Sequence, residues 1–122
     1  MNAKDLMIGD WVYDTILQGY TRVKVLTARG IKGDIHDNIW DEDSFAPIPL
    51  TPEILEKNGW RSRMNRTGEF YLKKPLVDAA IVTKTITGFQ MNHGPFCRLS
   101  IHYVHQLQHA LSLCGIEKEI EL

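Results

Sequence analysis

The segment LTPEILEKNGW, residues 50–60, constrains the fold more than any other stretch of this sequence. Thr51 suits the N-cap of a helix, Pro52 suits its first turn, and Gly59 suits the left-handed position after its last turn. These signals predict a short helix near the middle of the chain. The residues before and after it favour strands, so the helix is expected to separate two β-rich parts.

The first part, residues 1–50, contains short runs in which apolar and polar residues alternate. In YTRVKVLTA, Val23 and Val25 share one side of the predicted strand, and Arg22 and Lys24 share the other. The glycines of RGIKGD mark a turn. Several short, bent strands predict either a bent antiparallel sheet or a small barrel of the Src-homology-3 kind.

The second part, residues 51–122, adds a predicted hairpin from WRSRM and EFYLKK, and one long strand in AAIVTKTITGFQM. A strand in FCRLSI is expected to pair with that strand, and a C-terminal amphipathic helix ended by Gly115 follows. The sequence therefore predicts an α+β fold, mostly antiparallel, in which residues 1–122 form a single domain.

The bulk composition limits what the chain can do. With 122 residues, 43% of them hydrophobic, it is long enough for one compact domain. Its formal net charge of −1 removes the overall attraction that draws basic proteins to nucleic acids and anionic membranes. The opening residues lack the pattern of a secretion signal, and no apolar run reaches membrane-spanning length. A cytoplasmic protein with no membrane partner is therefore expected.

Three histidines in IHYVHQLQHALSLCG, which we call the histidine stripe, come closest to a chemical motif: His102, His105 and His109. On a helical wheel they fall within about 60° of one another and opposite the leucine side, so they are expected to face away from the core. No carboxylate or cysteine shares their sector, which disfavours a metal site. The stripe is expected to be solvated or to contact a partner, with a structural hydrogen bond from one ring as the alternative.

Three blocks of the sequence point to a family: IGDWV, PIPLTPEILEKNGW and YVHQLQHALSLCGIEKEIEL. They resemble small uncharacterised proteins of gut anaerobes, their phages and mobile elements, which carry IGNWV, PIPLTEE-L-KFGF and KYVHQLQNLYFALTGEEL. No function is established for that family, so the resemblance implies no activity. His102 and His109 stand where the family has Lys and Asn. The shared polar residues His105, Gln106 and Gln108 are therefore the centre of a candidate partner-binding surface, which His102 and His109 extend.

The middle of the chain carries a second candidate surface. Residues 51–75 contain six basic and three acidic residues, whereas residues 1–50 contain five basic and eight acidic ones. In the predicted hairpin, Arg61 and Arg63 share a face that Tyr71 and Lys73 are expected to join. Arginines beside an aromatic ring suit stacking on bases and binding of phosphates. A solvated sheet face is the alternative.

The sequence contains no nucleophile elbow, no glycine-rich phosphate loop and no H-E-x-x-H motif. No catalytic or metal-binding residue and no cofactor are predicted. We therefore expect a non-enzymatic accessory or adaptor protein that binds a protein partner or a second copy of itself as a homodimer. Nucleic-acid binding through the hairpin is the alternative, and a metal-dependent hydrolase is a third hypothesis.

Overall fold

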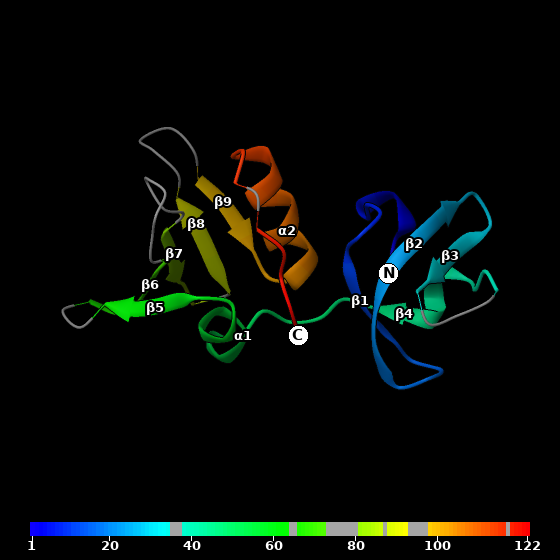
Figure 1. The fold of residues 1–122 in the computed structure, drawn as a ribbon, viewed down its shortest axis with the longest axis horizontal. Coiled ribbons are helices and arrows are strands. Elements are labelled where there is room, and N and C mark those ends of the chain that lie inside the picture. The colour runs from blue at the N-terminus through cyan, green and yellow to red at the C-terminus, as the bar shows by residue number, and fades with distance from the viewer. Residues whose placement is uncertain (35–37, 64–65, 73–80, 87, 93–97, 117) are drawn as a thin grey trace. The chain divides into compact units, whose positions relative to one another are not determined.

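The computed structural model describes the chain apart from residues 35–37, 64–65, 73–80, 87, 93–97 and 117, and describes residues 62–72, 81 and 98 by their backbone. Antiparallel sheets and helices confirm the predicted α+β class. The chain divides into two compact units, Met1–Ile48 and Pro49–Leu122 (Figure 1). That the two parts form one domain stays a prediction.

The first unit is built on a four-stranded antiparallel sheet in the order β3-β2-β1-β4. Its strands are β1 (Trp11–Asp14), β2 (Gly19–Thr27), β3 (Gly30–Gly33) and β4 (Phe45–Ala46). Two short 3-10 helices, η1 (Ala3–Asp5) and η2 (Glu42–Ser44), flank them. The alternation expected in β2 is present as far as Val23, which is buried, and Lys24, which is exposed. The expectation that Val25 shares a side with Val23 is wrong, because the register shifts between them and their partners, Lys32 and Gly33, are neighbours on β3 that project to opposite faces.

A single segment, residues 40–46, pairs with two different strands of this unit, β3 and β1. Trp40 forms an isolated bridge with Ile31 of β3, and Phe45 and Ala46 then pair with β1. Gly30 lies so close to the carbonyl of Trp40 that a Cβ at this position would collide with it. The first unit is thus a bent sheet whose described pairings form no continuous closed ladder, and the small barrel stays a prediction.

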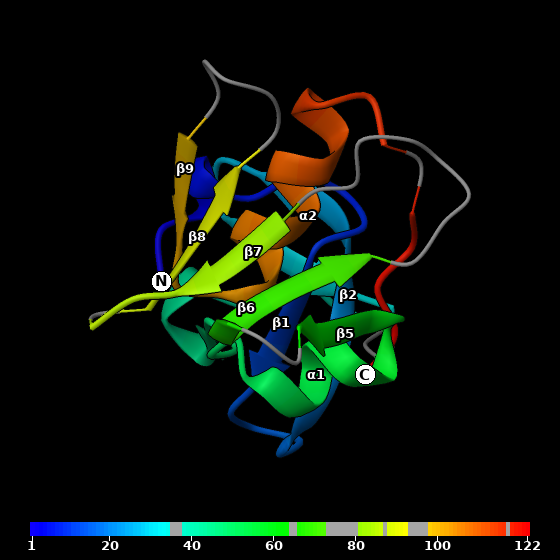
Figure 2. The same ribbon diagram turned by 90° about the vertical axis from the view of Figure 1, so that its left-hand side faces the viewer.

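The second unit contains a five-stranded antiparallel sheet in the order β5-β6-β7-β8-β9. Its strands are β5 (Trp60–Arg63), β6 (Arg66–Leu72), β7 (Ile81–Lys84), β8 (Phe89–Asn92) and β9 (Arg98–Ile101). Figure 2 shows them side by side, from β5 in green to β9 in gold, with α2 (Val104–Leu113) beside the sheet. Among the described residues, no helix combines the length and apolar character needed to cross a lipid bilayer.

The prediction of one long strand in this unit is wrong. The segment AAIVTKTITGFQM forms β7 and β8 rather than one strand, and a turn separates them, because the Thr85 amide donates to the Gly88 carbonyl at 2.8 Å. Threonine and isoleucine at residues 83–86 fit a strand equally well, so the alternation alone did not reveal the turn.

The predicted central helix is confirmed as α1 (Pro52–Lys57). The Thr51 hydroxyl accepts from the Ile54 amide at 3.3 Å, and Gly59 has a φ of +97°. At the other end of α1, buried Asn58 binds the C-terminal tail. Its amide nitrogen donates to the Glu121 carbonyl at 2.8 Å, and its oxygen accepts from the Glu121 amide at 2.7 Å. Ile120 beside this contact is buried in the core.

Candidate functional site

The outer side of the β1–β2 hairpin brings aromatic and cationic residues together. In the ladder, Trp11 lies opposite Arg22 and Tyr13 lies opposite Tyr20. Directly opposed residues project from the same face of a sheet, so these four share one face, which we call the aromatic face. The residues that alternate with them along the strands are buried on the inner face: Val12, Asp14, Thr21 and Val23.

Ring contacts hold the aromatic face in one arrangement. The Arg22 guanidinium carbon lies 4.7 Å from the centroid of the Trp11 ring, a cation–π distance. The Tyr13 and Tyr20 rings meet edge to face, with centroids 6.1 Å apart and planes at 73°. Tyr20 is nevertheless 52% exposed. The rings are therefore positioned before any partner arrives, which lowers the entropy lost on binding.

Two exposed aliphatic residues lie at the end of the same hairpin, in the turn between β1 and β2, and this turn projects beyond the sheet in Figure 1. Ile16 and Leu17, the hairpin tip, are 48% and 50% exposed. Buried Asp14 fixes their backbone, since its Oδ1 accepts from the Ile16 amide at 2.9 Å and the Leu17 amide at 3.0 Å. Two apolar side chains are thus displayed on a rigid turn.

The turn is also tied to a neighbouring segment of the same unit. The Thr15 amide and hydroxyl both donate to the Ser44 carbonyl, at 3.0 and 2.8 Å. Gln18 adopts a φ of +55°, a left-handed conformation that is uncommon for residues other than glycine. These hydrogen bonds fix the turn, so the exposed Ile16 and Leu17 are held in a defined position.

The composition of this surface is typical of protein-binding sites. Single exposed apolar residues are common on any protein, but adjacent ones mark interaction surfaces. Tryptophan, tyrosine and arginine are the residues most enriched among those that dominate binding energy at interfaces. The aromatic face and the hairpin tip together therefore form the strongest candidate site among the described residues.

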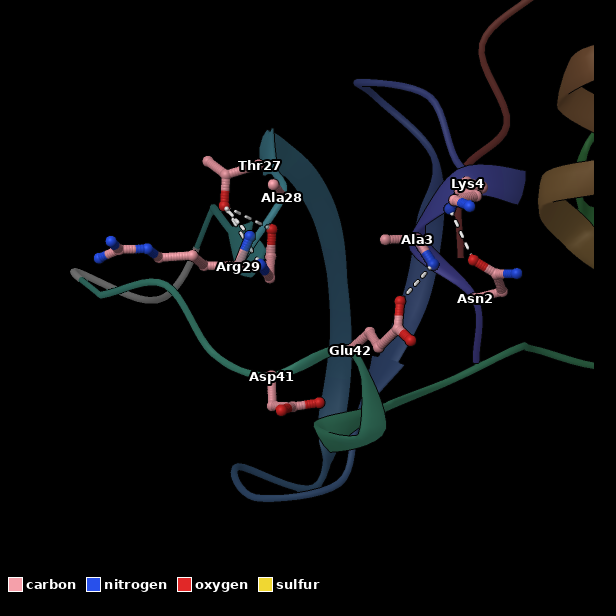
Figure 3. Close-up of a pocket in the computed structure, with 9 residues that line it drawn as sticks. Asn2, Ala3, Lys4, Thr27, Ala28, Arg29, Asp41 and Glu42 are labelled. Atoms are coloured by element: carbon pink, nitrogen blue, oxygen red, sulfur yellow. Dashed lines mark hydrogen bonds between the residues drawn. The ribbon is translucent and has the colours of Figure 1, made fainter.

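A pocket of about 450 Å³ lies elsewhere in the first unit, between η1, the β2–β3 turn and η2 (Figure 3). Several of its polar groups are engaged by the chain itself. Glu42 Oε2 accepts from the Ala3 amide at 2.8 Å, and Thr27 Oγ1 accepts from the Arg29 amide at 3.1 Å. The Arg29 side chain extends away from the other labelled side chains. The pocket walls thus tie η1 to η2 and do not present converging ligand groups.

The histidine stripe differs from its prediction. His105 is 5% exposed, so the expectation that it faces away from the core is wrong. Its ring stacks on Tyr103, with centroids 5.8 Å apart and planes at 7°, and His109 meets it edge to face at 5.7 Å. The helix begins at Val104, so His102 precedes it and does not belong on its wheel. The imidazole of His105 is a buried packing group.

Gln106 has a structural part as well. Its Oε1 accepts from the backbone amides of His102 at 2.7 Å and Tyr103 at 3.1 Å, which satisfies donors at the start of α2. Of the predicted partner-binding surface, His102 is exposed, and Gln108 and His109 are half-buried. Partner binding by these three stays a prediction. Within the described ranges, no three His, Cys, Asp or Glu residues are grouped as metal ligands.

The predicted nucleic-acid surface is described in part. Arg61 is exposed and lies opposite Tyr71 in the β5–β6 ladder, as a shared face requires. Arg63 lies opposite Arg66 after a shift in register. Lys73 falls outside the described residues. The ladder therefore pairs Arg61 with Tyr71 across the two strands. That Arg63 and Lys73 belong to the same surface stays a prediction.

Sequence reasoning missed the aromatic face although its signal is present. In DWVYDT, Trp11 and Tyr13 alternate with residues that proved buried, and in YTRV, Tyr20 and Arg22 do the same. Aromatic residues on the polar side of an alternating strand are the pattern that could have located it.

Comparison of the chain with protein-family models, with curated protein sequences and with solved structures gave no match. The family resemblance is therefore still an expectation.

Proposed function

We propose that this protein is a non-enzymatic adaptor that binds another protein through the aromatic face and the hairpin tip. One observation carries the proposal: Trp11, Tyr13, Tyr20 and Arg22 are held in register beside two exposed aliphatic residues on a fixed turn. Binding needs no further chemical group, since apolar burial and a few oriented polar contacts supply most interface energy. We propose in addition that the protein acts in the cytoplasm.

Two features favour a protein partner over a nucleic acid at this surface. The part of the sequence that forms the first unit holds five basic and eight acidic residues, so its overall field repels phosphates. Ile16 and Leu17 would gain nothing from a phosphate backbone, whereas an apolar pocket on a protein would bury them.

Site-specific photocrosslinking tests the proposal. A benzoylphenylalanine at position 20 keeps an aromatic ring there, and the same group at position 57, exposed on α1, is the matched control. In extracts of cells that make the protein, position 20 is expected to give a discrete protein adduct. Excess wild-type protein should compete for it, and a Leu17→Ser variant should compete poorly. Equal adducts from both positions, or none from position 20, would contradict the proposal.

A second candidate function is nucleic-acid binding at the β5–β6 hairpin. Its support is the register that places exposed Arg61 opposite Tyr71. Fluorescence anisotropy with a labelled oligouridine at low salt tests it. Binding that weakens as salt rises, and that Arg61→Ala reduces, would support this surface. Light scattering on the same samples measures the predicted homodimer.

A further inference from the structure

We infer that the partner protein contacts the hairpin tip through a basic segment with interspersed apolar residues, an inference that rests on the proposed function and specifies the partner. The two ends of the β1–β2 hairpin differ in charge. Its turn, residues 15–18, carries no charged side chain, and the acidic segment 41–43 lies beside it. Arg22 and Lys24 lie farther along β2, toward its other end. The partner is therefore expected to meet negative charge next to the hairpin tip.

The 3-10 helix η2 is fixed against the hairpin turn. At its end, the Ser44 carbonyl accepts from the amide and the hydroxyl of Thr15, at 3.0 and 2.8 Å. At its start, Asp41 caps the helix, and its Oδ1 accepts from the Asp43 amide at 3.0 Å. Asp41 and Asp43 are both exposed, and we call them the acidic rim. The Arg29 side chain extends away from Asp41 in Figure 3. At about 2 Å per residue in a 3-10 helix, the backbone of the acidic rim lies within about 6 Å of the turn contact.

The cationic residues of the hairpin lie too far along β2 to neutralise the acidic rim. Arg22 follows Tyr20 by two residues and Lys24 follows it by four, which places them about 7 and 13 Å beyond it along the strand. Exposed charges separated by more than about 8 Å are largely screened at physiological ionic strength. In η1, the exposed side chains of Lys4 and Asp5 have opposite charges and offset each other. The acidic rim therefore sets the sign of the charge at the hairpin tip.

A lysine or arginine of the partner suits this surface in two ways. Its aliphatic stem can cover the exposed side chains of Ile16 and Leu17, while its charged head stays in water near the acidic rim. The exposed ring of Tyr20 attracts a cation that lies over its face. An apolar residue of the same segment would bury more of the hairpin tip. A segment that combines basic and apolar residues therefore uses the whole surface.

Charge complementarity disfavours the other occupants of this surface. A nucleic acid or an acidic segment would bring negative charge to the acidic rim, and a symmetric contact with a second copy would bring a second acidic rim. Exposed ion pairs contribute little affinity by themselves. The acidic rim is therefore expected to select and orient the partner, and the hairpin tip to supply most of the affinity.

The experiment uses the full chain and a fluorescein-labelled octapeptide in which arginine and leucine alternate. Fluorescence anisotropy is expected to show saturable binding that weakens as ionic strength rises. An octapeptide of alternating arginine and serine should bind at least about tenfold more weakly, because it offers no apolar group to the hairpin tip. An octapeptide of alternating glutamate and leucine should not bind, and neither should a short oligo(dT).

Matched variants locate the binding. Asp43→Lys reverses one charge of the acidic rim and should weaken binding about tenfold. Glu56→Lys makes the same change at an exposed position of α1 and should leave binding unchanged. Leu17→Ser should also weaken binding about tenfold, whereas Ile8→Ser, at another exposed position, should not. Circular dichroism should show each variant folded.

The possible outcomes separate this inference from the proposed function. The inference fails if Glu56→Lys weakens binding as much as Asp43→Lys, or if the arginine–serine peptide binds as tightly as the arginine–leucine peptide. Tighter binding of oligo(dT) or of the acidic peptide than of the arginine–leucine peptide would also overturn it. Absence of basic-peptide binding, with a protein crosslink at position 20 retained, overturns the basic segment and leaves the proposed function standing. Loss of both overturns both.

Discussion

The aromatic face of the first unit and the histidine stripe of the second use similar side chains for opposite purposes. On β1 and β2, rings meet in pairs and stay open to solvent, with Tyr20 half exposed. At the start of α2, Tyr103, His105 and His109 pack on one another, and His105 becomes buried. Contacts between rings therefore do not distinguish a candidate binding surface from a packing cluster. The two are distinguished by how much of each ring stays exposed to solvent.

The largest expected difference lies in stability. His105→Ala removes a buried ring and its stacking contact with Tyr103, and should lower the free energy of unfolding by about 2–3 kcal/mol. His102→Ala, at an exposed position before the helix, should change it by less than about 0.5 kcal/mol. Urea denaturation followed by fluorescence measures both. Equal effects would mean that the stripe is not buried as described.

The next effect concerns the support of the hairpin tip. Asp14→Ala leaves the Ile16 and Leu17 amides without their acceptor and should cost about 1–2 kcal/mol. Asp14→Asn retains an acceptor oxygen and should cost less. Hydrogen exchange at those two amides should accelerate in the alanine variant. Unchanged exchange would show that Asp14 does not hold the turn.

A smaller loss is expected at the start of α2. Gln106→Ala removes the oxygen that accepts from the His102 and Tyr103 amides, and should cost about 1 kcal/mol. Glutamate at the same position keeps the acceptor and suits the first turn of a helix, so Gln106→Glu is the control. Thermal melting compares the two, and similar melting temperatures for alanine and glutamate would argue against this cap.

The smallest effect on stability should come from the proposed binding surface. Leu17→Ser changes a half-exposed side chain and should alter the free energy of unfolding by less than about 0.5 kcal/mol. The same change should reduce competition in the crosslinking assay. Ile8→Ser, at an exposed position before β1, is the matched control. A large destabilisation by Leu17→Ser would reassign the tip to the core.

The sequence predicted best where the chemistry is local. Thr51, Pro52 and Gly59 act on their own turn of chain, so the helix between them was predicted with its correct ends. The alternation at the start of β2 likewise follows from the two-residue period of a strand, as far as the shift in register after Val23. Both features require no knowledge of what packs against them.

The other features could not be predicted, because they depend on contacts between residues that are distant in the sequence. The wheel for α2 counted His102 as helical, because only the Gln106 side chain reaching back reveals where the helix begins. The aromatic face appears only after the register sets Trp11 against Arg22. Arg61 lies opposite Tyr71 in the β5–β6 ladder, whereas Lys73 lies outside the described residues, so the shared surface of these residues stays a prediction.

The Asn58 contact with Glu121 has a consequence for how the second unit is assembled. It joins the Asn58 side chain to the backbone of Glu121, 63 residues along the chain, and the closure of so long a loop carries a large entropic cost before the contact contributes. Shortening the chain after residue 115 would strip Ile120 from its buried site and leave a gap at the end of α1. Removal of these last residues is therefore expected to lower the stability of the second unit.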